Sequence, residues 1–246
     1  LIYNYQGYIR RLRGNYREAI PYYQRAAALM RQLGLGGISG VLTNQAYAMT
    51  MMGYERHGRE TAKEALDYAV RNHSVYDQVR ALNVRAILET RAGDPEKGLG
   101  FAEEALELLR EYPDHRLEGL VRITMARALR YQWNEEVSEI LSQWRTKWEV
   151  LPKALAHLEG SEYTRERLGI SLKEEIRAGA IELLKSTSDR ESWVSALNES
   201  GCLWREVAWV TRDSDKEKNR IAHQRAEGRL LQAAGIEPRK SDWFPQ

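Results

Sequence analysis

The stretch RGNYREAIPYYQRAAAL, residues 13–29, carries small and aromatic residues at three- and four-residue steps, the spacing of an amphipathic helix. The spacing returns in GYERHGRETAKEALDY, residues 53–68, and in GDPEKGLGFAEEALEL, residues 93–108. Each copy has a glycine, a small residue five positions later and an alanine twelve positions later, and the glycines are 39 and 40 residues apart. A period of this length indicates a stack of helical hairpins.

A second helical segment precedes each of these glycines and carries a small residue seven positions before it. Two helices joined by a tight turn approach closely only where their side chains are small, and the glycine lets the chain leave the first helix without steric cost. The predicted crossing positions are Gly7, Ala19 and Ala26, then Ala46, Gly58 and Ala65, and finally Ala86, Gly98 and Ala105. One hairpin cannot bury its own apolar face, so several are expected to stack.

These nine positions resemble the small-residue signature of the tetratricopeptide repeat (TPR). The usual unit has about 34 residues, so hairpins of this period should be longer. Arg10 and Glu89 stand where the family usually has a large residue. The long period and loops such as Gln32-Leu33-Gly34 are similar to the repeat arrays of MalT-like (STAND) signal-transduction ATPases and of peptide-sensing bacterial regulators.

The repeat pattern fades in the second half. A fourth unit has Trp133 in place of the turn glycine, and all seven tryptophans lie between Trp133 and Trp243. Helical patterns cover about 152–168, 172–186, 190–211 and 213–234, with Ser161 and Gly169 as interruptions or turns. We therefore expect an all-α, right-handed α-solenoid of antiparallel hairpins with about twelve helices. Residues 1–150 would form four repeats, and residues 151–246 degenerate repeats with a capping helix.

Composition excludes several classes of function. The net charge of +2 gives no reason to expect nucleic-acid binding, and no apolar run is long enough to span a membrane. The five histidines and the single cysteine have no metal-ligand spacing, and no catalytic constellation or phosphate loop is present. We expect no enzyme activity, no cofactor, no metal and a cytoplasmic location. Because the chain begins at Leu1 within a helical pattern, we interpret it as part of a longer protein.

The first helices of stacked hairpins line the concave face of a solenoid, so the repeat register predicts which residues meet a ligand. The predicted set is Asn4, Tyr8 and Arg11; Thr43, Tyr47 and Thr50; Arg80, Asn83, Ile87 and Thr90; and Ile123, Arg127 and Arg130. The set holds four arginines and no carboxylate. Arginine pairs in a fork with carboxylates and phosphates, so an acidic protein or peptide segment, or an anionic small ligand, is the expected partner. A face that is merely solvated, or covered by another domain, is the alternative.

Replacing Arg80 and Arg127 by Glu should abolish binding without lowering stability. A strict carboxylate clamp of the chaperone-binding kind is rejected. Asn44 and Arg80 match it, but Asn4, Tyr8 and Val84 do not. The resemblance thus implies a recognition or scaffold region of a larger bacterial signalling protein, with a STAND-type ATPase as the leading setting. A peptide-sensing transcription regulator, or a scaffold without ligand switching, is the alternative.

The proline within the opening stretch needs its own explanation. Pro21 falls on a repeat position shared with Glu60 and Gly100, and this position should face outward. It should cost one backbone hydrogen bond and bend the helix modestly.

Overall fold

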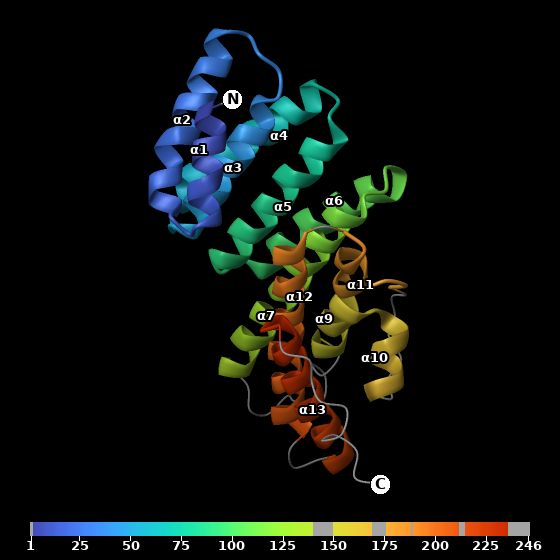
Figure 1. Cartoon of the computed structure of the whole chain (residues 1–246). Helices are drawn as coiled ribbons and strands as arrows, with labels where there is room; N and C mark the ends of the chain where they lie inside the picture. Colours follow the sequence, from blue (N-terminus) through green and yellow to red (C-terminus); the bar gives the residue numbers. More distant parts are fainter. Residues whose placement is uncertain (1, 140–149, 169–175, 188, 212–214, 236–246) are drawn as a thin grey trace. The chain divides into compact units, whose positions relative to one another are not determined.

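The computed structural model describes residues 2–139, 150–168, 176–187, 189–211 and 215–235. Within these ranges the chain forms twelve α-helices and no strand, which confirms the all-α class and the expected number of helices (Figure 1). The chain divides into two compact units, residues 1–113 and 114–246, and each is described by itself. The compact units part after Pro113, whereas the sequence-based division at residue 150 follows the fading of the repeat pattern.

Unit 1 is a series of three helical hairpins in which each helix packs on the next (Figure 1). The first helices of the hairpins also contact one another, α1 with α3 and α3 with α5. The helices are α1 (Ile2–Leu12), α2 (Tyr16–Gln32), α3 (Ile38–Met51), α4 (Glu55–Arg71), α5 (Val75–Arg91) and α6 (Pro95–Glu111). This serial packing is what a stack of hairpins requires.

The three hairpin turns have the same geometry, as the repeat pattern predicts. Gly14, Gly53 and Gly93 have φ of 77°, 73° and 86°, the left-handed region that favours glycine. In each turn the residue after the glycine donates its backbone N–H to the carbonyl five residues earlier, at 2.9 Å. This bond satisfies a carbonyl at the end of the first helix.

All nine predicted crossing positions are buried. Gly7 shows why a small residue is needed, because a Cβ there would lie 2.8 Å from the ring of Tyr23. The repeat position predicted to face outward is also confirmed, since the three residues that share it are all exposed: Pro21, Glu60 and Gly100. The proline therefore lies within α2 on the side away from buried Ala19 and Tyr23.

Unit 2 departs from the predicted pattern in two places. Helix α7 (His115–Glu139) continues through Trp133, so no hairpin turn occurs there. The interruption expected at Ser161 is confirmed, because Gly160, with φ of 90°, separates α9 (Val150–Glu159) from α10 (Ser161–Leu168), while the turn expected at Gly169 lies outside the described residues. Of the segment 172–186, residues 176–179 are not helical, α11 is confined to Ala180–Lys185, and residues 172–175 lie outside the described part.

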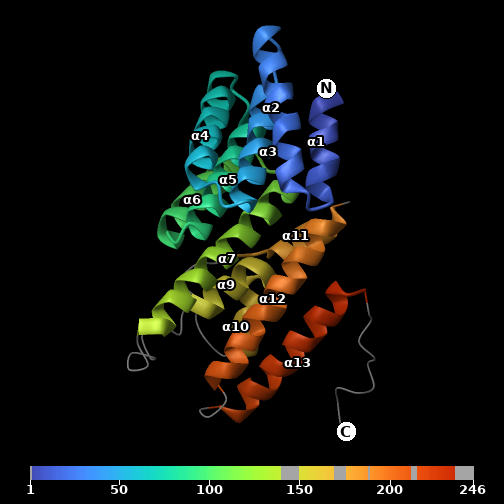
Figure 2. The ribbon, with the colours of Figure 1, turned by 90° about the vertical axis from the view of Figure 1, so that its left-hand side faces the viewer.

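The last two helices of unit 2, α12 (Arg190–Thr211) and α13 (Lys216–Ala233), lie in the predicted helical segments 190–211 and 213–234 and pack on each other as a hairpin (Figure 2). Gly201 lies at their crossing, where a Cβ would be 2.8 Å from Leu230. Helix α9 packs on α7, α10, α11 and α12. The side chain of its last residue, Glu159, is buried and accepts hydrogen bonds from Ser200 and Trp204 of α12 and from Arg229 of α13.

Candidate ligand-binding face

The predicted ligand-binding residues fall in both compact units. Helices α1, α3 and α5 of unit 1 carry Asn4, Tyr8, Arg11, Thr43, Tyr47, Thr50, Arg80, Asn83, Ile87 and Thr90. Helix α7 of unit 2 carries Ile123, Arg127 and Arg130. Because the three helices of unit 1 are neighbours, their residues can form one surface, which we call the α1–α3–α5 face.

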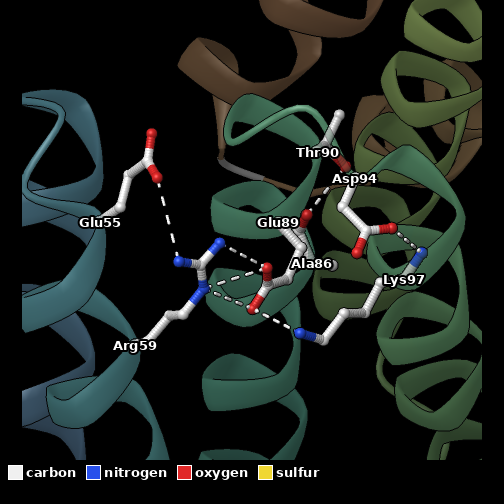
Figure 3. A network of polar contacts seen from close by, with 7 residues as sticks. All are labelled: Glu55, Arg59, Ala86, Glu89, Thr90, Asp94 and Lys97. Carbon is white, nitrogen blue, oxygen red and sulfur yellow. Dashed lines mark hydrogen bonds and ion pairs between the residues drawn. The ribbon is translucent and has the colours of Figure 1, made fainter.

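The prediction is wrong for three threonines of that face. Thr43, Thr50 and Thr90 are each at most 4% exposed, and each hydroxyl donates to the carbonyl four residues earlier, at 2.8 to 2.9 Å. Thr50 lies against Gly58, and Thr90 lies against Gly98, so both fill the crossing inside a hairpin. Figure 3 shows the hydroxyl of Thr90 bonded to the carbonyl of Ala86. These hydroxyls are not available to a ligand.

Arg11 lies between two aromatic rings. Its guanidinium carbon is 5.0 Å from the ring centre of Tyr8 and 5.4 Å from that of Tyr47. Tyr47 in turn meets Tyr16 edge to face, with ring centres 6.1 Å apart. Among the residues that the structure describes, no carboxylate forms an ion pair with Arg11. The stacked rings therefore orient a guanidinium that keeps its charge for a partner.

Arg80 is held by a different set of contacts. It donates to Oδ1 of Asn44 at 3.0 Å, and the carboxylate of Asp77 lies 3.7 Å away. Its guanidinium lies over Gly40, where a Cβ would be only 3.3 Å from it. Asp77 corrects the expectation that this face holds no carboxylate, because Asp77 comes one turn before Arg80 on the same helix.

Tyr23 of α2 is not among the predicted ligand-binding residues. Its ring lies against Gly7 and it is completely buried, and no hydrogen bond of good geometry reaches its hydroxyl although Arg11 lies beside it. Burial raises the pKa of Tyr23, while the charge of Arg11 and its contact with the hydroxyl, together with the charge of Arg80, lower it in part. The hydroxyl thus stays protonated at neutral pH. The signal in the sequence is Gly7, which leaves the space that the ring fills.

Further polar atoms of the same face also lack partners. Oδ1 of Asn4, Oδ1 of Asn83 and Nε of Arg11 are buried without a hydrogen bond. Buried polar atoms are normally paired, so an accumulation of unpaired ones from α1, α2 and α5 marks this part of unit 1 as unusual.

The two arginines of unit 2 have internal partners. Nε of Arg127 lies 3.1 Å from Glu199, and Nε of Arg130 lies 2.6 Å from its other oxygen. Arg127 also donates to Ser195 at 2.7 Å. The side chain of Glu199 is only 7% exposed. Arg127 and Arg130, which the sequence places on the ligand-binding face, are thus already paired within unit 2, because α12 supplies the carboxylate that they bind. Ile123, on α7 like the two arginines, is buried in the hydrophobic core.

In the part of the chain that the structure describes, no group of three or more His, Cys, Asp or Glu residues is arranged to hold a metal ion. Nor is any described helix both long and apolar enough to cross a membrane. No protein-family model matches the chain, and no curated protein matches it in sequence. The TPR resemblance therefore stays a prediction that rests on the repeated residues.

Proposed function

We propose that unit 1 is a recognition module that binds a peptide or protein segment of acidic character on its α1–α3–α5 face. The observation that carries this proposal is the state of Arg11, a guanidinium stacked between Tyr8 and Tyr47 with no carboxylate bound to it among the described residues. A charge that is oriented by rings but not neutralised is poised for an external anion.

The rest of the face supplies the other contacts that a peptide needs. Tyr8 is 38% exposed, and Tyr76, whose ring lies 5.6 Å from the guanidinium of Arg80, is 49% exposed. Tyrosine and arginine are enriched among the residues that dominate interfaces. Asn4 and Asn83 are half-buried amides, which can both donate to and accept from a peptide backbone. The binding set is therefore Asn4, Tyr8, Arg11, Tyr47, Arg80, Asn83 and Ile87, without the three buried threonines or the arginines of unit 2.

A matched pair of arginines on α5 tests this proposal. The full chain is used to select binders from a random-peptide display library, and binding is then measured for Arg80→Glu and Arg91→Glu. Arg91 is an exposed arginine at the end of the same helix. We expect acidic peptides to be enriched, Arg80→Glu to weaken their binding at least about tenfold, and Arg91→Glu to leave it within about twofold. No enrichment of any peptide, or an equal effect of the two variants, would contradict the proposal.

The wider setting rests on the repeat resemblance alone. We propose that the hairpins continue as a right-handed solenoid and that this is a ligand-sensing or scaffold region of a cytoplasmic signalling protein, such as a STAND-type ATPase. A peptide-sensing transcription regulator is the alternative. The coding sequence upstream of Leu1 separates the two, because a phosphate-binding loop favours the ATPase and a helix-turn-helix favours the regulator. If the upstream sequence holds neither motif, both settings are wrong, and the proposed recognition module is unaffected.

A further inference from the structure

A second set of unpaired arginines lies in unit 2, where helix α10 packs on helix α13. The guanidinium carbon of Arg167, on α10, lies 5.6 Å from the ring centre of Tyr163 on the same helix. The guanidinium carbon of Arg225, on α13, lies 5.2 Å from the centre of the same ring. Because an aromatic ring attracts a guanidinium that lies over its face, Tyr163 holds together two cationic side chains from different helices.

Neither of these arginines forms an ion pair with a carboxylate in the part of the chain that the structure describes. Two other arginines of α13 do, since Arg220 and Arg229 lie 2.6 Å and 2.8 Å from a carboxylate oxygen. The Nε of Arg167 is buried and has no hydrogen-bond partner. Arg167 and Arg225 are both half-buried, so each keeps part of its surface open to solvent and its charge uncompensated.

The buried carboxylate of Glu159, at the end of α9, is already matched by Arg229. Its Oε1 accepts hydrogen bonds from Nε of Arg229 at 2.8 Å and from Nε1 of Trp204 at 3.2 Å, and the side chain is only 1% exposed. Its Oε2 is buried without a partner, so Glu159 forms no bond with Arg225. Arg225 lies one turn before Arg229 on α13, and this anchored neighbour fixes where Arg225 is presented.

The phenol of Tyr163 removes none of the positive charge. Burial, followed by the charge of Glu159, raises the pKa of Tyr163, and the charges of three arginines lower it only in part. The phenol is therefore neutral at physiological pH. Two guanidinium charges thus meet at one ring, and no carboxylate of the described residues is paired with either.

We propose that Arg167 and Arg225 form a binding site for a phosphate group, either as inorganic phosphate or as the phosphate of a small molecule. A phosphate monoester carries about 1.5 to 2 negative charges at neutral pH, which matches two unpaired guanidiniums, whereas one carboxylate would leave a charge unmatched. Guanidiniums also donate to phosphate oxygens in a fork. This site belongs to unit 2 and does not depend on peptide binding by unit 1.

Calorimetric titration of the full chain tests the site at pH 7.5 and constant ionic strength. The probes are inorganic phosphate, free phosphoserine and acetate. We expect at least one phosphate form to bind with a dissociation constant of about 1 mM or lower, and acetate to bind at least about tenfold more weakly. The tighter of the two phosphate forms identifies the ligand as free or esterified phosphate. If neither phosphate form binds, or acetate binds equally well, the site is wrong and the recognition module of unit 1 is unaffected.

Two arginines of α13 provide a matched comparison. Arg225→Gln should weaken phosphate binding at least about tenfold, whereas Arg220→Gln, which removes an arginine already paired on the same helix, should change it less than about twofold. Because Arg225 has no ionic partner among the described residues, its replacement should leave the melting temperature unchanged. Equal effects of the two variants on binding would contradict the site.

The ring of Tyr163 is a positioning group, and two substitutions separate it from the hydroxyl. Tyr163→Phe keeps the ring and removes a buried hydroxyl that has no partner, so neither the melting temperature nor the affinity for phosphate should fall. Tyr163→Leu removes the surface on which both guanidiniums lie, so the affinity should drop severalfold. An equal loss in both variants would contradict the stacking role of the ring.

Discussion

Arg59 of α4 and Glu89 of α5 form a forked ion pair in which Nε and one terminal nitrogen of the guanidinium bond to both carboxylate oxygens at 2.9 to 3.1 Å (Figure 3). The Glu89 side chain is only 5% exposed, and Lys97 of α6 lies 3.4 Å from it. Glu89 stands at a position where the TPR resemblance predicts a large residue. At this position, therefore, a charged group joins one hairpin to the preceding one.

Arg59→Met should lower the free energy of unfolding by about 1–3 kcal/mol, because it leaves the buried Glu89 with Lys97 alone. The double variant Arg59→Met/Glu89→Leu should recover most of this loss, since an apolar pair of similar volume needs no hydrogen bonds. Urea unfolding at neutral pH measures both. The control is Arg56→Met, one turn before Arg59 on the same helix, which breaks an exposed ion pair with Glu60. It should lower the free energy of unfolding by less than about 0.5 kcal/mol.

The stability that Arg59→Met loses should depend on pH. Burial would raise the pKa of Glu89, but the hydrogen bonds and charge of Arg59, joined by Lys97, outweigh it and leave the pKa lowered. A lowered pKa contributes stability above the unfolded value that is lost as the pH falls through the folded value. The difference between wild type and Arg59→Met should therefore shrink in acid. A difference that grows in acid, or a cost equal to that of Arg56→Met, would contradict the role of the pair.

Two glycines on α6 should respond in opposite directions to the same change. A Cβ on Gly98 would lie 2.9 Å from the carbonyl oxygen of Ala86 and closer still to the hydroxyl of Thr90, whereas a Cβ on Gly100 would meet nothing within 4 Å. Gly98→Ala should therefore destabilise unit 1 by about 1–3 kcal/mol. Gly100→Ala should stabilise it by about 0.5–1 kcal/mol through helix propensity. Thermal unfolding of both variants checks this, and equal shifts would show that α5 and α6 do not cross at Gly98.

The sequence predicted the fold of unit 1 well because close helix crossings impose a residue type. Ala46 and Gly98 are small for a reason that the periodicity reveals, and Gly53 is required by a positive φ. The outward position of Pro21 follows from the same register. Unit 2 was predicted less well, because helix α7 contains Trp133 where a glycine would have marked a turn, and a tryptophan does not specify whether a helix ends.

The candidate site was only partly predictable. The repeat register identifies which residues lie on the first helix of each hairpin. Neighbouring positions on that helix, however, face either solvent or the second helix of the hairpin. Even the same repeat position differs in burial, since Thr50 and Thr90 are buried while Arg11 is half-buried, so the register alone does not determine exposure. Long-range partners such as Glu199, 69 residues from Arg130, leave no local signal in the sequence.

Arg127→Glu should destabilise unit 2, contrary to the sequence-based expectation that it abolishes binding without lowering stability. It would place a second carboxylate beside the nearly buried Glu199 and remove a donor to Ser195, at a cost of about 2–4 kcal/mol. Adding Glu199→Gln should recover part of this loss by removing the repulsion. Urea unfolding measures both variants, with Arg205→Glu, an exposed arginine on α12, as the control. An unchanged stability of Arg127→Glu would mean that the pair contributes nothing.

His157 should make unit 2 sensitive to acid. Burial, with the charges of Arg122 and Lys153, lowers the pKa of His157 to about 3. Nδ1 lies 3.5 Å from the guanidinium of Arg122, and Nε2 is buried without a partner, so the folded state holds the neutral ring. Glu118 pairs with Arg122 at 2.6 Å and offsets part of its charge.

The direction in which pH changes the stability of unit 2 follows from proton binding to His157. An unfolded histidine takes up a proton near pH 6.5, whereas the folded one resists it until about pH 3. Between these values the unfolded state binds more protons, so stability falls as the pH falls, by up to about 1.4 kcal/mol per pH unit. His157→Gln cannot be protonated, so its stability should decline less steeply from neutral pH toward pH values near 4. Urea unfolding at several pH values compares the two slopes. Parallel curves would show that His157 is protonated in the folded protein as easily as in the unfolded chain.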